Sequence, residues 1–76
     1  MKKVLYIGAE EMKQESAKKI LDEFDEYDLK IYRLETQNIE LLNNLVEECE
    51  IIAYTIDSEE ILKNYVLKDK ILIKLE

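Results

Sequence analysis

Carboxylates are the side chains with the most chemistry to offer in this sequence, which has 18 acidic and 11 basic residues among 76 and a net charge of −7. One group of them follows the apolar runs that we expect to form strands, together with hydroxyl side chains and one glycine. Its members are Gly8, Glu10, Glu11, Glu35, Thr55, Asp57, Ser58, Glu59 and Glu60. Carboxylate oxygens hold Mg²⁺ in proteins, but acids in the first turn of a helix also stabilise its positive end. We favour the second interpretation, and because the group contains no basic residue we expect no phosphate to bind there.

A second group of acids lies where a helix is expected to end and the next strand to begin. Its members are Asp22, Glu23, Asp25, Glu26 and Asp28. They belong to residues 21–60, which carry 13 acids against two basic residues (−11), whereas residues 1–20 and 61–76 each have a net charge of +2. Acids at a helix C-terminus oppose the helix dipole. The group is therefore either a solubilising rim or a docking surface for a basic protein, such as one that binds nucleic acid.

The composition excludes most familiar active sites. Without histidine there is no Ser-His or Cys-His pair and no imidazole metal ligand. The single Cys49 excludes an intrachain disulfide, a C-x-x-C pair and a cysteine zinc site, and its acidic neighbours make it a poor nucleophile. The single Gly8 excludes the glycine-rich loops that bind nucleotide phosphates. We therefore expect neither enzymatic activity nor a cofactor.

The elements that must position these acids alternate along the chain. Residues 4–7 and 51–56 are apolar almost throughout, which is typical of strands buried on both faces. Residues 27–34 and 71–75 alternate between apolar and polar positions, as strands with one exposed face do. Between them, apolar residues three and four apart predict three helices. The first helix is expected to begin directly after Gly8.

This βαβαβαβ order predicts a single α/β domain over residues 1–76, with a four-stranded parallel sheet between layers of helices. The two strands that are apolar on both faces belong in the centre and the two alternating ones at the edges. The strand order is then 2-1-3-4, a small three-layer, flavodoxin-like arrangement. Right-handed crossovers place the first helix on one face and the other two on the opposite face.

The acids after the first and third strands resemble those of response-regulator receiver domains, over about residues 2–60. The resemblance implies that Asp57 stands at the place of the phospho-accepting aspartate, with Glu10 and Glu11 near the place of the metal-binding acids. The first strand of this chain ends in Gly8-Ala9, where receiver domains have an acidic pair.

A single helix cannot cover four strands, so part of the sheet beside the first helix is expected to be open. Residues 71–75 form an edge strand, with Ile73 directed to the two-helix face and Leu72 and Lys74 to the other. Ile51 and Leu72 would then be uncovered, and Lys74 alone would protect the edge from pairing. We expect a homodimer through Ile51, Leu72, Ile73 and Lys74, which would enlarge a small core.

Together these features predict a non-enzymatic protein–protein interaction module, a small acidic regulatory or inhibitory protein that binds a basic partner and itself. The alternative is a degenerate receiver-like or divalent-cation-binding domain with Asp57 at the site. We expect no direct contact with nucleic acid or membrane, since the charge repels both phosphate and anionic lipid. A cytoplasmic location is expected because the chain has no leader and no apolar run of about 20 residues.

Overall fold

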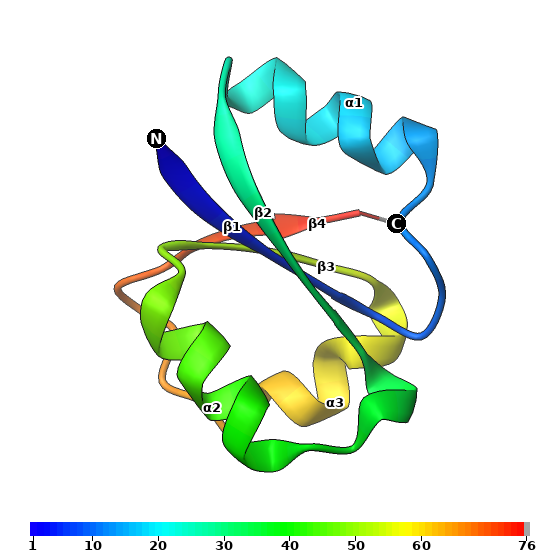
Figure 1. The fold of residues 1–76 in the computed structure, drawn as a ribbon, viewed down its shortest axis with the longest axis vertical. Helices are drawn as coiled ribbons and strands as arrows, with labels where there is room; N and C mark the ends of the chain where they lie inside the picture. The colour runs from blue at the N-terminus through cyan, green and yellow to red at the C-terminus, as the bar shows by residue number, and fades with distance from the viewer. Residues whose placement is uncertain (76) are drawn as a thin grey trace.

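The alternation of apolar segments produces an α/β fold, which the computed structural model describes over residues 1–75. All four strands are parallel and lie in the order β2-β1-β3-β4, which confirms the predicted topology. Helix α1 covers one face of the sheet, and α2 and α3 cover the other (Figure 1). The elements, with η for a 3₁₀ turn, are β1 (Lys2–Gly8), α1 (Gln14–Glu23), β2 (Tyr27–Arg33), η1 (Leu34–Thr36), α2 (Ile39–Glu48), β3 (Ile51–Tyr54), η2 (Ile56–Ser58), α3 (Glu59–Leu62) and β4 (Ile71–Lys74).

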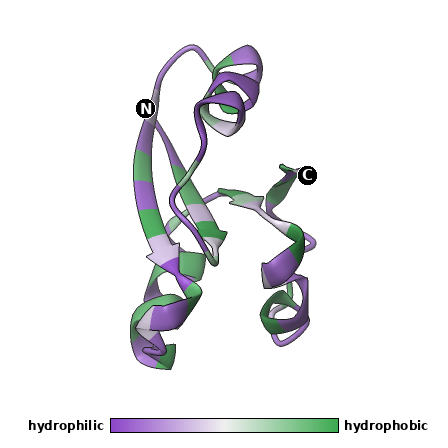
Figure 2. Cartoon of the chain, turned by 90° about the vertical axis from the view of Figure 1, so that its right-hand side faces the viewer, coloured by the Kyte–Doolittle hydropathy of each residue, from purple (hydrophilic) through white to green (hydrophobic). Residues whose placement is uncertain are grey.

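The central position of β1 follows from its apolar residues at consecutive positions. Leu5 and Ile7 pack on the α2 side of the sheet, while Val4 packs on the α1 side, and all three are fully buried. Burial of such a side chain stabilises the fold by roughly 1.5–3 kcal/mol. Strand β2 instead alternates, as the succession of purple and green along it shows at the left of Figure 2. Strand β2 can therefore stand at an edge, as predicted.

The direction of the side chains of β4 differs from the expectation. Leu72 is in register with Ile52 and Ile73 with Ala53. Residues in register on parallel strands share a face. Ile73 therefore packs in the α1-side core, and Leu72 faces the α2 and α3 side. The expected phase is wrong because three consecutive apolar residues leave the alternation undecided.

The register of β4 is set by the turn that precedes it. The Ile71 amide donates to the Glu50 carbonyl at 2.9 Å, and the Lys70 amide donates to Leu67 at 2.9 Å. The Lys70 ammonium also donates to the Cys49 carbonyl at 2.8 Å. These contacts fix where β4 begins, and hence which of its residues point to each face.

Ile51 is fully buried, so the expectation that it lies open beside α1 is wrong. It belongs to one apolar cluster with Ile20 of α1 and Ile73 of β4, so the core under α1 extends to β3 and β4. The apolar residues left exposed on this face lie at its margins instead. Ile31 of β2 is 54% exposed and Ile71 is 48% exposed.

Helix α1 begins at Gln14, later than expected, so Glu10 and Glu11 lie in the preceding loop. The Tyr6 hydroxyl donates to the Glu10 carbonyl at 2.8 Å and holds this loop against the end of the sheet. In the described part of the chain, no helix has the length and apolar character needed to span a bilayer.

Candidate functional site

The acids Asp22, Glu23, Asp25 and Glu26 lie together at the amino end of the sheet, and all four are exposed. Asp22 and Glu23 occupy the last turn of α1, which has no basic residue. Asp25 and Glu26 follow in the turn that leads into β2. The position of this group is as the sequence predicted, and the acids do oppose the dipole of α1.

Several other charges at this end are paired. Lys2 lies 3.5 Å from Glu50, and Lys3 lies 3.3 Å from Glu48. Asp28, the fifth predicted acid, is half-buried in β2 and lies 3.7 Å from Lys30. Within residues 1–75, no ion pair involves the four acids at the end of α1. Four of the five predicted carboxylates are thus available to a partner.

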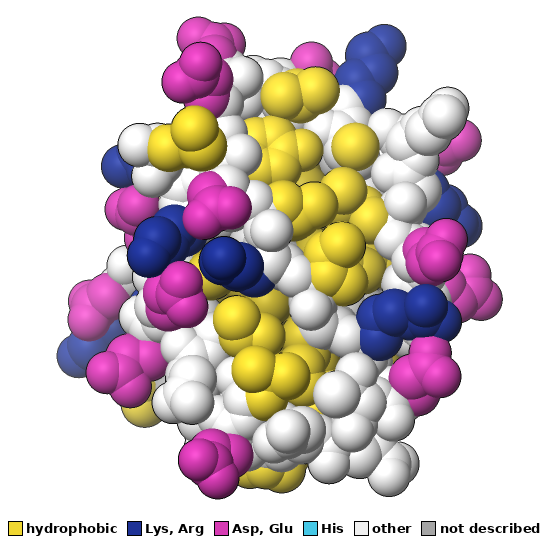
Figure 3. Space-filling view, viewed as in Figure 1, with side chains coloured by type: hydrophobic (Ala, Val, Ile, Leu, Met, Phe, Trp, Pro, Cys, Tyr) yellow, Lys and Arg dark blue, Asp and Glu magenta, His cyan; other side chains and the backbone are white. Residues whose placement is uncertain are grey.

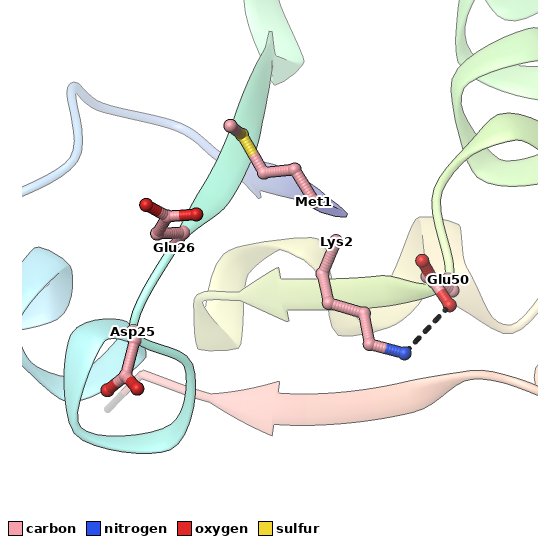
Figure 4. Close-up of a pocket in the computed structure, with 5 residues that line it drawn as sticks. All are labelled: Met1, Lys2, Asp25, Glu26 and Glu50. Carbon is pink, nitrogen blue, oxygen red and sulfur yellow. Dashed lines mark hydrogen bonds and ion pairs between the residues drawn. The ribbon is translucent and has the colours of Figure 1, made fainter.

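Two of these acids, Asp25 and Glu26, line a hollow that is partly apolar. One part has a volume of about 460 Å³ and the other about 640 Å³, and Met1, Asp25 and Glu26 line both. In Figure 4, Lys2 reaches toward Glu50 and away from Asp25. We call this surface the amino-end hollow; its residues are Met1, Lys2, Leu21, Asp25, Glu26, Tyr27, Leu29 and Glu50.

Apolar side chains of the amino-end hollow are accessible. Leu21 is 50% exposed and Met1 is 83% exposed. Figure 3 shows that apolar side chains form a band down the face that carries β2, with acidic side chains at its upper left. The surface therefore combines an apolar floor with unpaired negative charge at its border.

The opposite, carboxyl end of the sheet holds a smaller cavity of about 170 Å³. We call it the carboxyl-end cavity; its lining residues are Tyr6, Ala9, Glu10, Glu11, Lys13, Ser16, Thr55 and Asp57. The structure thus brings Glu10, Glu11 and Asp57 to one place. No group of three or more acidic or cysteine side chains among residues 1–75 is placed to hold a metal ion.

Basic residues are present at the carboxyl end, contrary to the expectation. Lys13 lines the cavity, and Arg33 lies beside it at the end of β2. The Arg33 guanidinium lies 2.6 Å from Glu35 and 3.9 Å from Glu11. Neither residue was predicted at this site, because neither directly follows one of the expected strands. Two of the expected first-turn acids are therefore partners of one arginine.

Two buried hydroxyl side chains follow β3, and they differ in their hydrogen bonding. The Ser58 hydroxyl is buried and donates to the carbonyl oxygens of Thr55 at 2.7 Å and Ile7 at 3.1 Å. Thr55 is 6% exposed, and its Oγ1 finds no hydrogen-bond partner within residues 1–75. The sequence does contain a signal for this group, since Thr55 interrupts an otherwise apolar run.

Cys49 is fully buried at the end of α2, among apolar side chains. Burial raises the pKa of its thiol above the ordinary value, and the nearby Glu48 carboxylate raises the pKa further. The thiolate is the reactive form, so the structure agrees with an inert, packed cysteine.

Of the four residues expected at a dimer interface, two are exposed and two are buried. Leu72 is 47% exposed and Lys74 is exposed, although Lys74 lies 3.3 Å from Glu59. Ile51 and Ile73 are buried in the core and are not available at the surface. Beside Leu72 is an open, partly apolar hollow of about 480 Å³, bounded by α3 and by Tyr54.

No family model, curated protein or solved structure matches this chain.

Proposed function

We propose that the protein is a non-enzymatic interaction module, a small regulatory or inhibitory protein whose amino-end hollow binds a basic segment of another protein. The observation that carries the proposal is the set of four exposed acids at the end of α1, which form no ion pair within the described residues. Asp25 and Glu26 border an accessible apolar floor, so a segment with both basic and apolar side chains is the complementary ligand.

The energetics of α1 support this proposal. An exposed acid in the last turn of a helix costs about 0.3–1 kcal/mol of stability, because it opposes the dipole. Asp22 and Glu23 both occupy that turn, and Asp25 and Glu26 add their repulsion within the next few residues. A basic partner would relieve the repulsion on binding, so these charges favour the complex over the free protein.

The apolar floor supplies the rest of the contact. Leu21 and Met1 are exposed beside the half-buried Tyr27 and Leu29. Burial of apolar surface contributes about 25 cal/mol per Å², whereas exposed ion pairs contribute only about 0–1 kcal/mol each. Affinity would come from the floor, and the choice of a basic partner from the acids.

A designed peptide tests the proposal directly. The probe is a labelled peptide of about fifteen residues with leucines at helical spacing and lysines elsewhere, and its binding is followed by fluorescence anisotropy. The double variant Asp25→Asn with Glu26→Gln should weaken binding by about fivefold or more, given up to about 1 kcal/mol per exposed pair. The matched control, Glu15→Gln with Glu40→Gln, removes the same charge from exposed positions in the first turns of α1 and α2. Equal weakening by both variants would show that net charge alone attracts the peptide, and would refute a specific hollow.

We also propose that the chain pairs with a second copy of itself through β4. This strand ends the sheet, and Ile71 and Leu72 are each about half exposed on its two faces (48% and 47%). An antiparallel contact between two copies of β4 would pair the free edge and cover Leu72. Light scattering at micromolar concentration should give twice the mass of the chain. Leu72→Asp should give a folded monomer, and a monomeric wild type would refute the contact.

A further inference from the structure

The unpartnered Thr55 hydroxyl at the carboxyl end has no role in the proposed interaction with a basic protein. A buried hydroxyl without a hydrogen bond costs about 1–3 kcal/mol. The position of Thr55 is nevertheless fixed by three hydrogen bonds. Its amide donates to the Ile7 carbonyl at 3.2 Å, and its carbonyl accepts from the amide and the hydroxyl of Ser58 at 3.0 and 2.7 Å. The backbone thus holds the hydroxyl in place at the carboxyl-end cavity without supplying a partner for it.

The floor of the carboxyl-end cavity consists of its buried lining residues, which bear hydroxyl groups. Tyr6, Thr55 and Ser16 are 2%, 6% and 8% exposed. Ser16 is the third residue of α1, and Lys13 at the N-cap has no side-chain oxygen to accept from the first turn. The amide groups of that turn and the dipole of α1 therefore favour an anionic group at this point.

The rim of the cavity, unlike its floor, favours a positively charged group. Its exposed residues are Glu10, Glu11 and Asp57, with Lys13 as the single basic member. Arg33, beside the cavity, lies 3.9 Å from Glu11, and three acids against two basic residues leave a net negative charge. A net negative rim attracts a cation and repels a simple anion. The loop that carries Glu10 is held in place, because the Tyr6 hydroxyl donates to its carbonyl.

From this arrangement we propose that the carboxyl-end cavity binds a small zwitterion, of the kind represented by a free α-amino acid. The carboxylate accepts hydrogen bonds from Thr55, Ser16 and the first turn of α1, while the ammonium group lies against the acidic rim. A volume of about 170 Å³ corresponds to roughly five or six water molecules at ~30 Å³ each. The cavity therefore has room for about as many non-hydrogen atoms as glycine has.

Three small probes separate the two halves of this recognition: glycine, acetate and methylammonium. Each is titrated into the full chain labelled with ¹⁵N, and the amide resonances of the lining residues are followed. Glycine should shift these resonances with a millimolar dissociation constant, and acetate and methylammonium should bind at least tenfold more weakly. Equal binding of acetate would indicate a plain anion site, and equal binding of methylammonium a plain cation site. Either result would overturn the proposal.

Two conservative variants test which residues carry the binding. Thr55→Val keeps the shape and removes the hydroxyl, and it should weaken glycine binding at least tenfold, with Ser16→Ala weakening it less. Thr36→Val, at an exposed position of η1 outside the cavity, should leave binding unchanged. If glycine causes no shifts at all, or binds Thr55→Val as well as wild type, the cavity holds only water and the proposal is wrong. None of these outcomes bears on the peptide contact at the amino end.

Discussion

The single glycine of the chain provides a sharp test of the packing under the carboxyl-end cavity. Gly8 is the last residue of β1, and it is not in the left-handed region of backbone conformation. Its role is to leave space rather than to allow an unusual backbone angle. A β-carbon at this position would lie 2.4 Å from the Tyr6 hydroxyl oxygen, 2.9 Å from its Cζ and 3.0 Å from Thr55 Oγ1.

Gly8→Ala should therefore destabilise the protein. Overpacking of a buried site costs about 1–3 kcal/mol. Alanine also lowers the conformational entropy of the unfolded chain, which offsets about 0.4–1 kcal/mol of this cost. The net cost should be about 1–2 kcal/mol, because Tyr6 is 2% exposed and is bonded to Glu10, so its ring cannot move aside easily. In urea denaturation followed by circular dichroism, the midpoint should fall while the slope is unchanged.

A double-mutant cycle identifies the contact. Tyr6→Phe removes the oxygen at 2.4 Å and leaves the carbon at 2.9 Å, so the cost of Gly8→Ala should fall in this background but not vanish. Tyr54→Phe is the control, since Tyr54 packs on the opposite face and should leave the cost of Gly8→Ala unchanged. If Gly8→Ala costs the same with and without the Tyr6 hydroxyl, this contact is not the cause of the destabilisation.

Three further predictions concern other parts of the molecule. Replacing Asp22 with Asn and Glu23 with Gln should raise the unfolding free energy by about 0.3–1 kcal/mol each, measured in urea, and unfolding of this variant would show that the acids are structural. Asn38→Ala should cost about 1 kcal/mol in the same assay, because the Asn38 side chain accepts from the Leu41 amide at 3.0 Å and caps α2. The pKa of the Cys49 thiol is raised in the folded state by burial and by Glu48, so the unfolded chain loses this proton first as the pH rises. Stability should then fall above about pH 8.5, and Cys49→Val should show a smaller fall over the same range.

The order of the strands could be predicted because the residue types of each strand indicate whether one or both of its faces are buried. The residues from Val4 to Ile7 and those from Ile51 to Ala53 are apolar at consecutive positions, and all are buried from both sides. The alternation in β2 likewise indicated an edge. These features depend on local composition, which a sequence pattern reports well.

The phase of β4 and the start of α1 could not be predicted in the same way. Ile71, Leu72 and Ile73 are all apolar, so either phase satisfies the pattern, and the Ile71–Glu50 hydrogen bond decides between them. Glu10 looked like a first-turn residue, but the Tyr6 hydroxyl accounts for its place in a loop. The first outcome depends on a contact between segments distant in the sequence, and the second on a side-chain hydrogen bond that the pattern of residue types does not reveal.

The candidate site at the amino end was predictable in position but not in its state of pairing. The sequence places lysines and acids at the same end of the sheet, and only the structure shows that Lys2 and Lys3 pair with Glu50 and Glu48. The acids of the α1–β2 corner are left without partners in the described chain, and those in α1 lie against the dipole. A purely solubilising surface has no need for this arrangement, since exposed acids in first turns, such as Glu15 and Glu40, supply charge where the dipole favours it. The position of these acids beside the amino-end hollow therefore supports the proposed contact with a basic partner over a purely solubilising role.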